Sequence, residues 1–322
     1  MACAQRTVIE RSRPLPRRPL DGVLLLDKAH GLTSNAALQA AKRLLQARKA
    51  GHAGTLDPMA TGLLPLLFGE ATKLAFLLID ADKTYLADVV LGTTTTTGDA
   101  EGAIVETRAV AVKAGEIEAA LCRFRGEIEQ VPPMYSALKR DGRPLYAYAR
   151  AGEDVVRAPR RVQIHRLELL AHTAASLRIR VHCSKGTYIR TLAEDLGRAL
   201  GTGAHLGALR RVASGPWQIE RAVSLDQLEA APEAARAALL NPPETMLGEL
   251  PRFTLDAADE VRFRNGQARA GDGRSAGLYG VFASSDRLLG IGEIAADGRL
   301  YPRRLLHVPE SAQPAEKHRE TL

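Results

Sequence analysis

The sequence predicts a protein of both helices and strands, built as one large domain followed by a small β-rich domain. Three observations support this prediction. The chain has 322 residues, 45% of them hydrophobic, which is enough for two separate cores. Apolar runs of strand length are interspersed with segments of helical periodicity up to about residue 240. From about residue 250, short apolar segments are separated by glycines, as is typical of a small barrel or sandwich.

The first elements are an arm, a strand and a helix. Residues 1–20 carry several arginines and little apolar content, so we predict a disordered basic arm. Residues 22–26 are an apolar run of strand length. The helix that follows has Ser34 as its candidate N-cap, an apolar face that includes Leu38, and Gly51 as its end.

The clearest strand is predicted at residues 177–183. Its apolar residues alternate with Arg178, Arg180 and His182, so one face is expected to be buried and the other to be exposed and basic. Further strands are predicted at 63–67, 84–91, 161–170, 278–283 and 288–294. Further helices are predicted at 189–200 and 225–240.

Several classes of protein are excluded by composition. No segment supplies the roughly 18 uninterrupted apolar residues of a membrane span, so no membrane association is expected. The N-terminus has no apolar signal core, which favours a cytoplasmic location. Cys3, Cys122 and Cys183 form no CxxC pair and have no histidine cluster nearby, which argues against both a disulfide framework and a zinc site.

The net charge of +7 favours a polyanionic partner, because phosphate contacts release counterions. The excess belongs to the large domain, since the chain from residue 251 has 11 basic and 10 acidic residues. Within the large domain, residues 139–166 hold eight basic residues and three acidic ones. Direct contact with RNA and a solvated basic face are both consistent with this stretch.

A polar segment between the first helix and the next apolar run carries the strongest signal for chemistry. Residues 51–62, GHAGTLDPMATG, contain three glycines and no periodicity. Pro58 restrains Asp57 toward extended backbone and so helps to orient its carboxylate. On spacing alone, an Asx-type turn is the favoured role for Asp57, because Asp-Pro is common in turns.

Two further segments combine aromatic and basic residues. In 185–190, at the start of a predicted helix, Arg190 is placed to pair with a carboxylate and Tyr188 to pack against a base. In 132–140, Tyr135 lies close to Lys139 and Arg140, a combination that single-stranded RNA binding favours. Each segment alone also suits an ordinary turn with surface residues.

Together these segments resemble the TruB-type pseudouridine synthases. Residues 51–62 are similar to the catalytic loop of that family, and Asp27-Lys28 with 31–34 is similar to its first motif. The first motif departs at Ala29, where the family has proline. Further similar segments are 83–85, 91–102, 132–150, 186–190 and 206–210, so that the resemblance runs from about residue 20 to 220.

The resemblance implies an α+β fold: a mixed, mainly antiparallel sheet flanked by helices, with a small C-terminal PUA-like β-barrel. It implies a catalytic domain at 21–247, with an RNA-gripping insertion at about 131–152, and a PUA-like RNA-binding domain at 248–310. Residues 311–322 are then a polar tail. A monomer is implied as well.

The implied activity is isomerisation of uridine 55 in the T loop of tRNA to pseudouridine. Asp57 matches the catalytic aspartate, Arg190 its cationic partner, and Tyr85 the tyrosine that packs on the target base and takes part in proton transfer. Tyr188 and Leu209 match residues lining the uracil pocket. His52 matches a histidine that contacts RNA near the flipped nucleotide.

The reaction is redox-neutral and consumes no water, so no cofactor and no metal are expected. Asp57 suits either nucleophilic attack or removal of a sugar proton, and the sequence does not choose between them. Two other functions remain open: a non-catalytic RNA-binding protein or tRNA chaperone, and a hydrolase of glycosidic bonds. The hydrolase would need two paired carboxylates, and residues 51–62 offer one.

Overall fold

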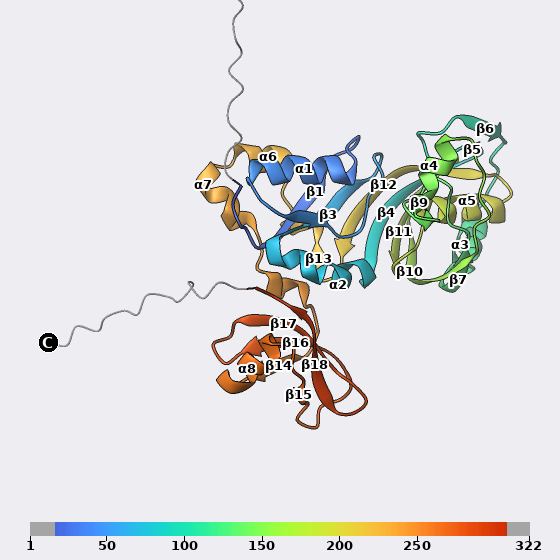
Figure 1. Ribbon diagram of the computed structural model, residues 1–322. Coiled ribbons are helices and arrows are strands. Elements are labelled where there is room, and N and C mark those ends of the chain that lie inside the picture. Colours follow the sequence, from blue (N-terminus) through green and yellow to red (C-terminus); the bar gives the residue numbers. More distant parts are fainter. Residues whose placement is uncertain (1–16, 308–322) are drawn as a thin grey trace, which may run out of the picture.

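The structure is a computed structural model that describes residues 17–307 (Figure 1). Most of the predicted arm and all of the predicted tail at 311–322 lie outside the described residues. The described end of the arm, 17–20, runs beside the end of the first helix. There Arg18 N donates to Gln46 O at 2.7 Å and Arg48 N donates to Arg18 O at 3.0 Å.

A nine-stranded sheet forms the centre of the large domain (Figure 1). All its neighbouring strands are antiparallel except one pair, which confirms the predicted mixed, mainly antiparallel sheet. The main order is β1 (Gly22–Lys28), β3 (Thr61–Phe68), β12 (Ala204–Ser214), β4 (Lys83–Leu91), β11 (Ser176–Cys183), β10 (Arg160–His172) and β7 (Gly126–Gln130). The short strands β2 (Ala50–His52) and β13 (Trp217–Gln218) pair with β3 and β12.

Helices cover the two halves of this sheet separately. Helices α3 (Ala114–Cys122) and α5 (Ile189–Ala199) pack on β4, β11 and β10, while α1 (Ser34–Leu44) and α6 (Leu225–Ala230) pack on β1 and β3. None of the helices described in 17–307 is long and apolar enough to cross a membrane. The remaining α-helices and strands of the domain are α2 (Ala75–Asp80), α4 (Leu145–Arg150), α7 (Glu233–Arg236), β5 (Thr93–Thr95), β6 (Ile104–Thr107), β8 (Lys139–Arg140) and β9 (Arg143–Pro144).

The first helix differs from its prediction at both ends. Thr33 is the N-cap, and its side chain accepts a hydrogen bond from Ala36 N. The helix ends at Leu44 instead of near Gly51, because Gln46 adopts a left-handed backbone with φ of 54°. The chain then enters β2 instead of continuing as helix.

Two other segments also differ from the sequence prediction. The helix predicted at 225–240 is divided into α6, α7 and a 3₁₀ turn, because Pro232 cannot continue a helix. Strand β12 was not predicted. It lacks a clean alternation because its register shifts around Gly207, where a Cβ would lie 2.8 Å from the Val90 side chain.

The C-terminal domain is a five-stranded sheet that curls into a half-barrel, in agreement with the predicted small β domain. The predicted strands at 278–283 and 288–294 are present. Trp217, Met246 and Ile291 belong to one buried cluster that joins this domain to the large one. The order of elements is β14 (Arg252–Leu255), β16 (Gly277–Ala283), β17 (Leu288–Ile294), β18 (Arg299–Leu305) and β15 (Arg269–Ala270), with α8 (Ala257–Arg264) packed beside them.

Candidate active site

Asp57 lies in the loop 53–60 between β2 and β3, which we call the Asp57 loop. The Ser34 hydroxyl, predicted as a helix cap, instead donates to Leu56 O at 2.9 Å and accepts from Leu56 N at 2.8 Å. Pro58 O accepts a hydrogen bond from Gly31 N at 2.8 Å. The start of α1 and the loop before it therefore position the backbone on both sides of Asp57.

Lys28, at the end of β1, is completely buried beneath the Asp57 loop. Its Nζ donates to Leu32 O at 2.7 Å, to Ala29 O at 3.0 Å and to Pro58 O at 3.3 Å. Burial lowers the pKa of Lys28 to about 8, although the nearby Asp57 carboxylate favours the charged form. Ala29 still supplies its carbonyl to this contact, although it replaces the family's proline.

Asp57 forms the ion pair that the sequence predicted with Arg190. Arg190 Nη2 lies 2.9 Å from Asp57 Oδ2. The Asp57 side chain is 41% exposed, whereas that of Arg190 is only 6% exposed. Burial raises the pKa of Asp57, and the Arg190 charge opposes that rise. Arg190 therefore favours the ionised carboxylate.

A second carboxylate, Asp99, supports Arg190 and was not predicted as a site residue. Its Oδ2 lies 3.6 Å from Arg190 Nη1, and its side chain is 5% exposed. Asp99 accepts hydrogen bonds from the Thr97 hydroxyl and from Glu101 N. Arg190 also donates to Thr97 O at 3.3 Å and to Tyr135 O at 2.6 Å. The sequence signal for Asp99 is its place in the threonine- and glycine-rich segment 91–102, which resembles the family but was given no site role.

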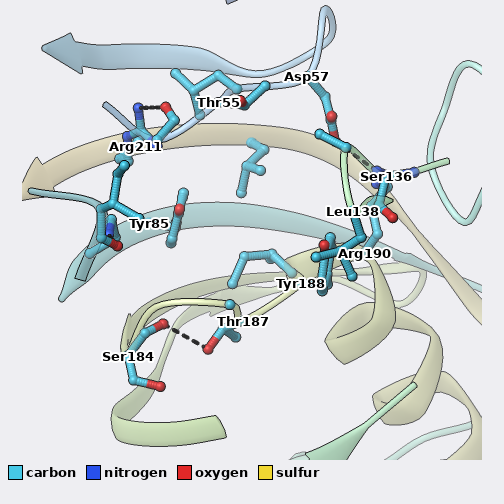
Figure 2. A pocket seen from close by; sticks show the side chains of 18 of the residues that line it. Thr55, Asp57, Tyr85, Ser136, Leu138, Ser184, Thr187, Tyr188, Arg190 and Arg211 are labelled. Atoms are coloured by element: carbon cyan, nitrogen blue, oxygen red, sulfur yellow. Dashed lines mark hydrogen bonds and ion pairs between the residues drawn. The ribbon is translucent and has the colours of Figure 1, made fainter. Parts of the chain in front are cut away.

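The predicted site residues meet in one cavity of about 540 Å³ (Figure 2). Burial raises the pKa values of Tyr85 and Tyr188. Burial also lowers the pKa of His52, with a smaller contribution from Arg211, so its imidazole is neutral at physiological pH. The site residues lining the cavity are His52, Asp57, Tyr85, Tyr188, Arg190 and Leu209.

Tyr188 is oriented by a side chain that the sequence did not reveal. Gln130, at the end of β7, accepts a hydrogen bond from Tyr188 N at 3.0 Å and donates to Tyr188 O at 3.3 Å. Gln130 is buried, and nothing in its local sequence marks it. These two hydrogen bonds fix the backbone at the N-terminus of α5, where both Tyr188 and Arg190 lie.

Two buried cations, Arg211 and Lys83, also line the cavity. Arg211 is 1% exposed and Lys83 is 6% exposed. Lys83 Nζ donates to the carbonyls of Leu78 and Ile79 at the end of α2, and burial lowers its pKa to about 8. Neither residue was predicted to belong to the site.

Residues 131–152, predicted as an RNA-gripping insertion, form part of the cavity wall. Ser136 and Leu138 line the cavity, and Tyr135 O accepts the hydrogen bond from Arg190 already described. A second cavity of about 470 Å³ shares Asp57 and Arg190 with the first and is also lined by Tyr146 and Arg150. Among residues 17–307, no group of three His, Cys, Asp or Glu side chains is arranged to hold a metal ion.

Models of known protein families match most of the described chain. Residues 42–189 match the TruB family pseudouridylate synthase (N terminal domain). Residues 190–248 match the tRNA pseudouridylate synthase B C-terminal domain, and residues 251–306 match the Pseudouridine synthase II TruB, C-terminal domain.

Similar proteins carry the same family name. A tRNA pseudouridine synthase B from Aromatoleum aromaticum is 58% identical, over 92% of this chain and 96% of its own length. Another from Azoarcus sp. is 55% identical, over 91% of this chain and 97% of its own length.

Solved structures agree with these relatives. A chain from an H/ACA RNP bound to a substrate RNA containing 2'-deoxyuridine aligns with a TM-score of 0.70 and 25% identity, over 91% of this chain and 87% of its own length. A chain from a Cbf5-Nop10-Gar1 complex aligns with a TM-score of 0.66 and 29% identity, over 84% of this chain and 78% of its own length. The resemblance expected from the sequence is confirmed: the chain belongs to the TruB family of pseudouridine synthases.

Proposed function

We propose that this protein isomerises uridine to pseudouridine in tRNA, at position 55 of the T loop. One observation carries the proposal: the Asp57 carboxylate pairs with Arg190 at 2.9 Å inside a cavity walled by two tyrosines. The names of the similar proteins support tRNA as the substrate. The net charge of +7 suits a polyanionic partner of this kind.

The target uridine must leave its stack to reach Asp57, which costs a few kcal/mol. Tyr85 and Tyr188 supply aromatic surface that offsets this cost, and Leu209 supplies an apolar contact. The neutral imidazole of His52 lies beside them and contacts the RNA without adding charge.

The rearrangement breaks the C1′–N1 bond, and its electron pair stays with the base. The base then turns, C5 bonds to C1′, the C5 proton leaves, and N1 takes up a proton. Asp57 either attacks as a nucleophile or removes a sugar proton, and both roles need the ionised carboxylate. Arg190 and Lys28 favour that form. Because atoms and electrons balance within the substrate, the proposal includes no cofactor or metal.

The hydrolase alternative is less consistent with the site. A glycosidic hydrolase uses two carboxylates that both reach the substrate. Asp99 is the second carboxylate near Asp57, but its side chain is 5% exposed and pairs with Arg190. It is therefore unable to act directly on a bound sugar.

The parts of the chain take the following proposed roles. Residues 21–247 form the catalytic domain, and the insertion (131–152) grips the RNA beside the cavity. Residues 248–310 form a PUA-like RNA-binding domain. The protein acts as a monomer in the cytoplasm on the T arm of tRNA.

Tritium release from a tRNA transcript labelled at uridine C5 tests the reaction. Wild-type protein is expected to release one equivalent of tritium, and Asp57→Asn none while still binding the transcript. A transcript with cytidine at position 55 is the matched control for position and should release none. No release by wild type despite tight binding would leave an RNA-binding protein, and free uracil in the products would indicate a hydrolase.

A further inference from the structure

Arg211 is a buried cation that lines the cavity, and its hydrogen bonds end on backbone groups. Its Nε donates to Leu63 O at 2.7 Å, and its Nη2 donates to Gly54 O at 2.9 Å. These two carbonyls lie on opposite sides of Asp57 in the chain. The neighbouring Arg210 pairs with Asp27, whereas in the described part of the chain Arg211 has no ion pair with a carboxylate.

An unpaired guanidinium that is only 1% exposed is costly, because its charge is removed from water without a counter-ion. Two backbone carbonyls supply partial compensation. A buried charge of this kind, lining a cavity, marks a candidate functional residue.

The fold places Arg211 directly beside Tyr85. The two residues are Cα partners in the antiparallel pairing of β12 with β4, and both line the cavity (Figure 2). Gly54 permits this packing, since a Cβ there would lie only 3.3 Å from Arg211 Nη1. The third guanidinium nitrogen, Nη1, takes part in neither of these two backbone hydrogen bonds.

We propose that Arg211 is a positioning residue that orients the Tyr85 hydroxyl and stabilises its phenolate, so that Tyr85 accepts the C5 proton at the end of the reaction. The inference rests on the proposed function and extends it to the last chemical step. The charge of Arg190 stabilises the ionised Asp57 carboxylate, and the charge of Arg211 stabilises the Tyr85 phenolate in the same way.

The step balances as follows. After C5 bonds to C1′, the base carries both hydrogen and C1′ on C5 and has a double bond between N1 and C6. The phenolate oxygen takes the C5 proton, and the C5–H electron pair forms the C5–C6 double bond. The N1–C6 π electrons move to N1, which takes a proton from water, and the phenol later returns its proton to water.

The charges around Tyr85 support this role. Burial raises the pKa of Tyr85, while the positive charge of Arg211 lowers that pKa. Without Arg211, the phenolate would therefore be scarcer at any given pH. The other ionisable groups facing the site around Tyr85 are Lys83 on the same strand, Cys183 on β11, Asp57 in the Asp57 loop and His52 on β2.

A deuterium isotope effect separates this role from a structural one. Single-turnover rates are measured with tRNA that carries hydrogen or deuterium at C5 of the target uridine. Arg211→Gln is expected to slow the reaction about 10²-fold, the low end of what acid–base assistance contributes. Its isotope effect should exceed that of wild type, because C5–H cleavage becomes the slowest step. Its rate should also recover as pH rises.

Two further variants keep the test decisive. Arg211→Lys retains the charge and should restore part of the rate with a smaller isotope effect than Arg211→Gln, and it carries the test if Arg211→Gln does not fold. Arg178→Gln is the matched control, since Arg178 pairs with Asp88 on the exposed face of the same sheet. It should match wild type in rate and isotope effect.

Equal isotope effects in wild type, Arg211→Lys and Arg211→Gln would overturn the inference and leave Arg211 a purely structural residue. That result would leave the proposed function intact, since wild type would still form pseudouridine. Failure of wild type to form pseudouridine would instead overturn the proposed function itself.

Discussion

At the scale of single residues, the site is a chain of charges that alternate in sign. Asp57 faces the cavity, Arg190 lies behind it, and Asp99 lies behind Arg190. Asp99 is less exposed than Asp57, so it positions Arg190 without reaching the substrate. Asp99 therefore contributes by holding the Arg190 guanidinium in position beside Asp57.

Asp99→Asn should lower the single-turnover rate about 10²-fold, because a small displacement of Arg190 misplaces Asp57. The dissociation constant for tRNA should stay close to that of wild type. Asp88→Asn is the control, since Asp88 pairs with Arg178 on the exposed side of the sheet. Equal rates for Asp99→Asn and wild type would show that Asp57 and the carbonyls of Thr97 and Tyr135 suffice to hold Arg190 in place.

The ionised carboxylate of Asp57 is expected to lower the free energy of unfolding. Its pKa is higher in the folded protein than in the unfolded chain, chiefly because of burial. The unfolded chain therefore releases this proton at lower pH, and the ionised form destabilises the folded protein. The cost is absent below the unfolded pKa and complete above the folded one.

Asp57→Asn should accordingly have a melting temperature at pH 7 equal to or above that of wild type. The difference should shrink as pH falls through the folded pKa of Asp57 toward its unfolded value. Melting curves for both proteins at a series of pH values measure it. A variant clearly less stable than wild type at pH 7 would mean that the Arg190 ion pair outweighs the burial of the carboxylate.

At the scale of elements, the 3₁₀ turn Gly69–Leu74 links the catalytic sheet to the C-terminal domain. Glu70 accepts hydrogen bonds from Lys73 Nζ and from His307 N, and Lys73 Nζ donates to Leu305 O at 3.0 Å. Beside these polar contacts lies the apolar cluster that contains Trp217 and Ile291. Apolar burial of this kind outweighs partly exposed ion pairs.

Ile291→Ala should lower the free energy of unfolding by about 2–5 kcal/mol, because Ile291 is completely buried. Lys73→Ala should cost about 1 kcal/mol or less, since Lys73 is 33% exposed. Trp217, the only tryptophan in the chain, is buried at this junction and reports docking by its fluorescence. Comparable losses in the two variants would mean that polar contacts dominate the junction.

At the scale of the whole molecule, the exposed basic residues fall into two classes. The outward arginines of β11 follow the predicted alternation, and Arg178 among them is paired with Asp88. Of the eight basic residues in 139–166, five form ion pairs: Arg140, Arg143, Arg157, Arg161 and Arg166. Within the described residues, Lys139, Arg150 and Arg160 form none, and Arg150 lines the second cavity. These three are the side chains free to meet phosphates.

Replacing Lys139, Arg150 and Arg160 together by alanine should weaken tRNA binding and reduce the slope of log affinity against log salt by about 2–3. Binding measured between low and moderate salt gives this slope. The matched control replaces Arg108, Arg125 and Arg178, which are all ion-paired. An equal change in slope for both triple variants would mean that net charge, and not position, governs binding.

The family and most strand positions were readable from local motifs and from alternation. The same motifs predicted the site residues Asp57, Arg190, Tyr85, Tyr188, Leu209 and His52, which the fold brings to one cavity. The sequence did not determine β12, since a register shift at Gly207 removes the alternation. It also left Asp99, Gln130 and Arg211 unassigned. Those three act on partners at least 58 residues away in the chain, so only the tertiary structure could bring their charges and hydrogen bonds to the site.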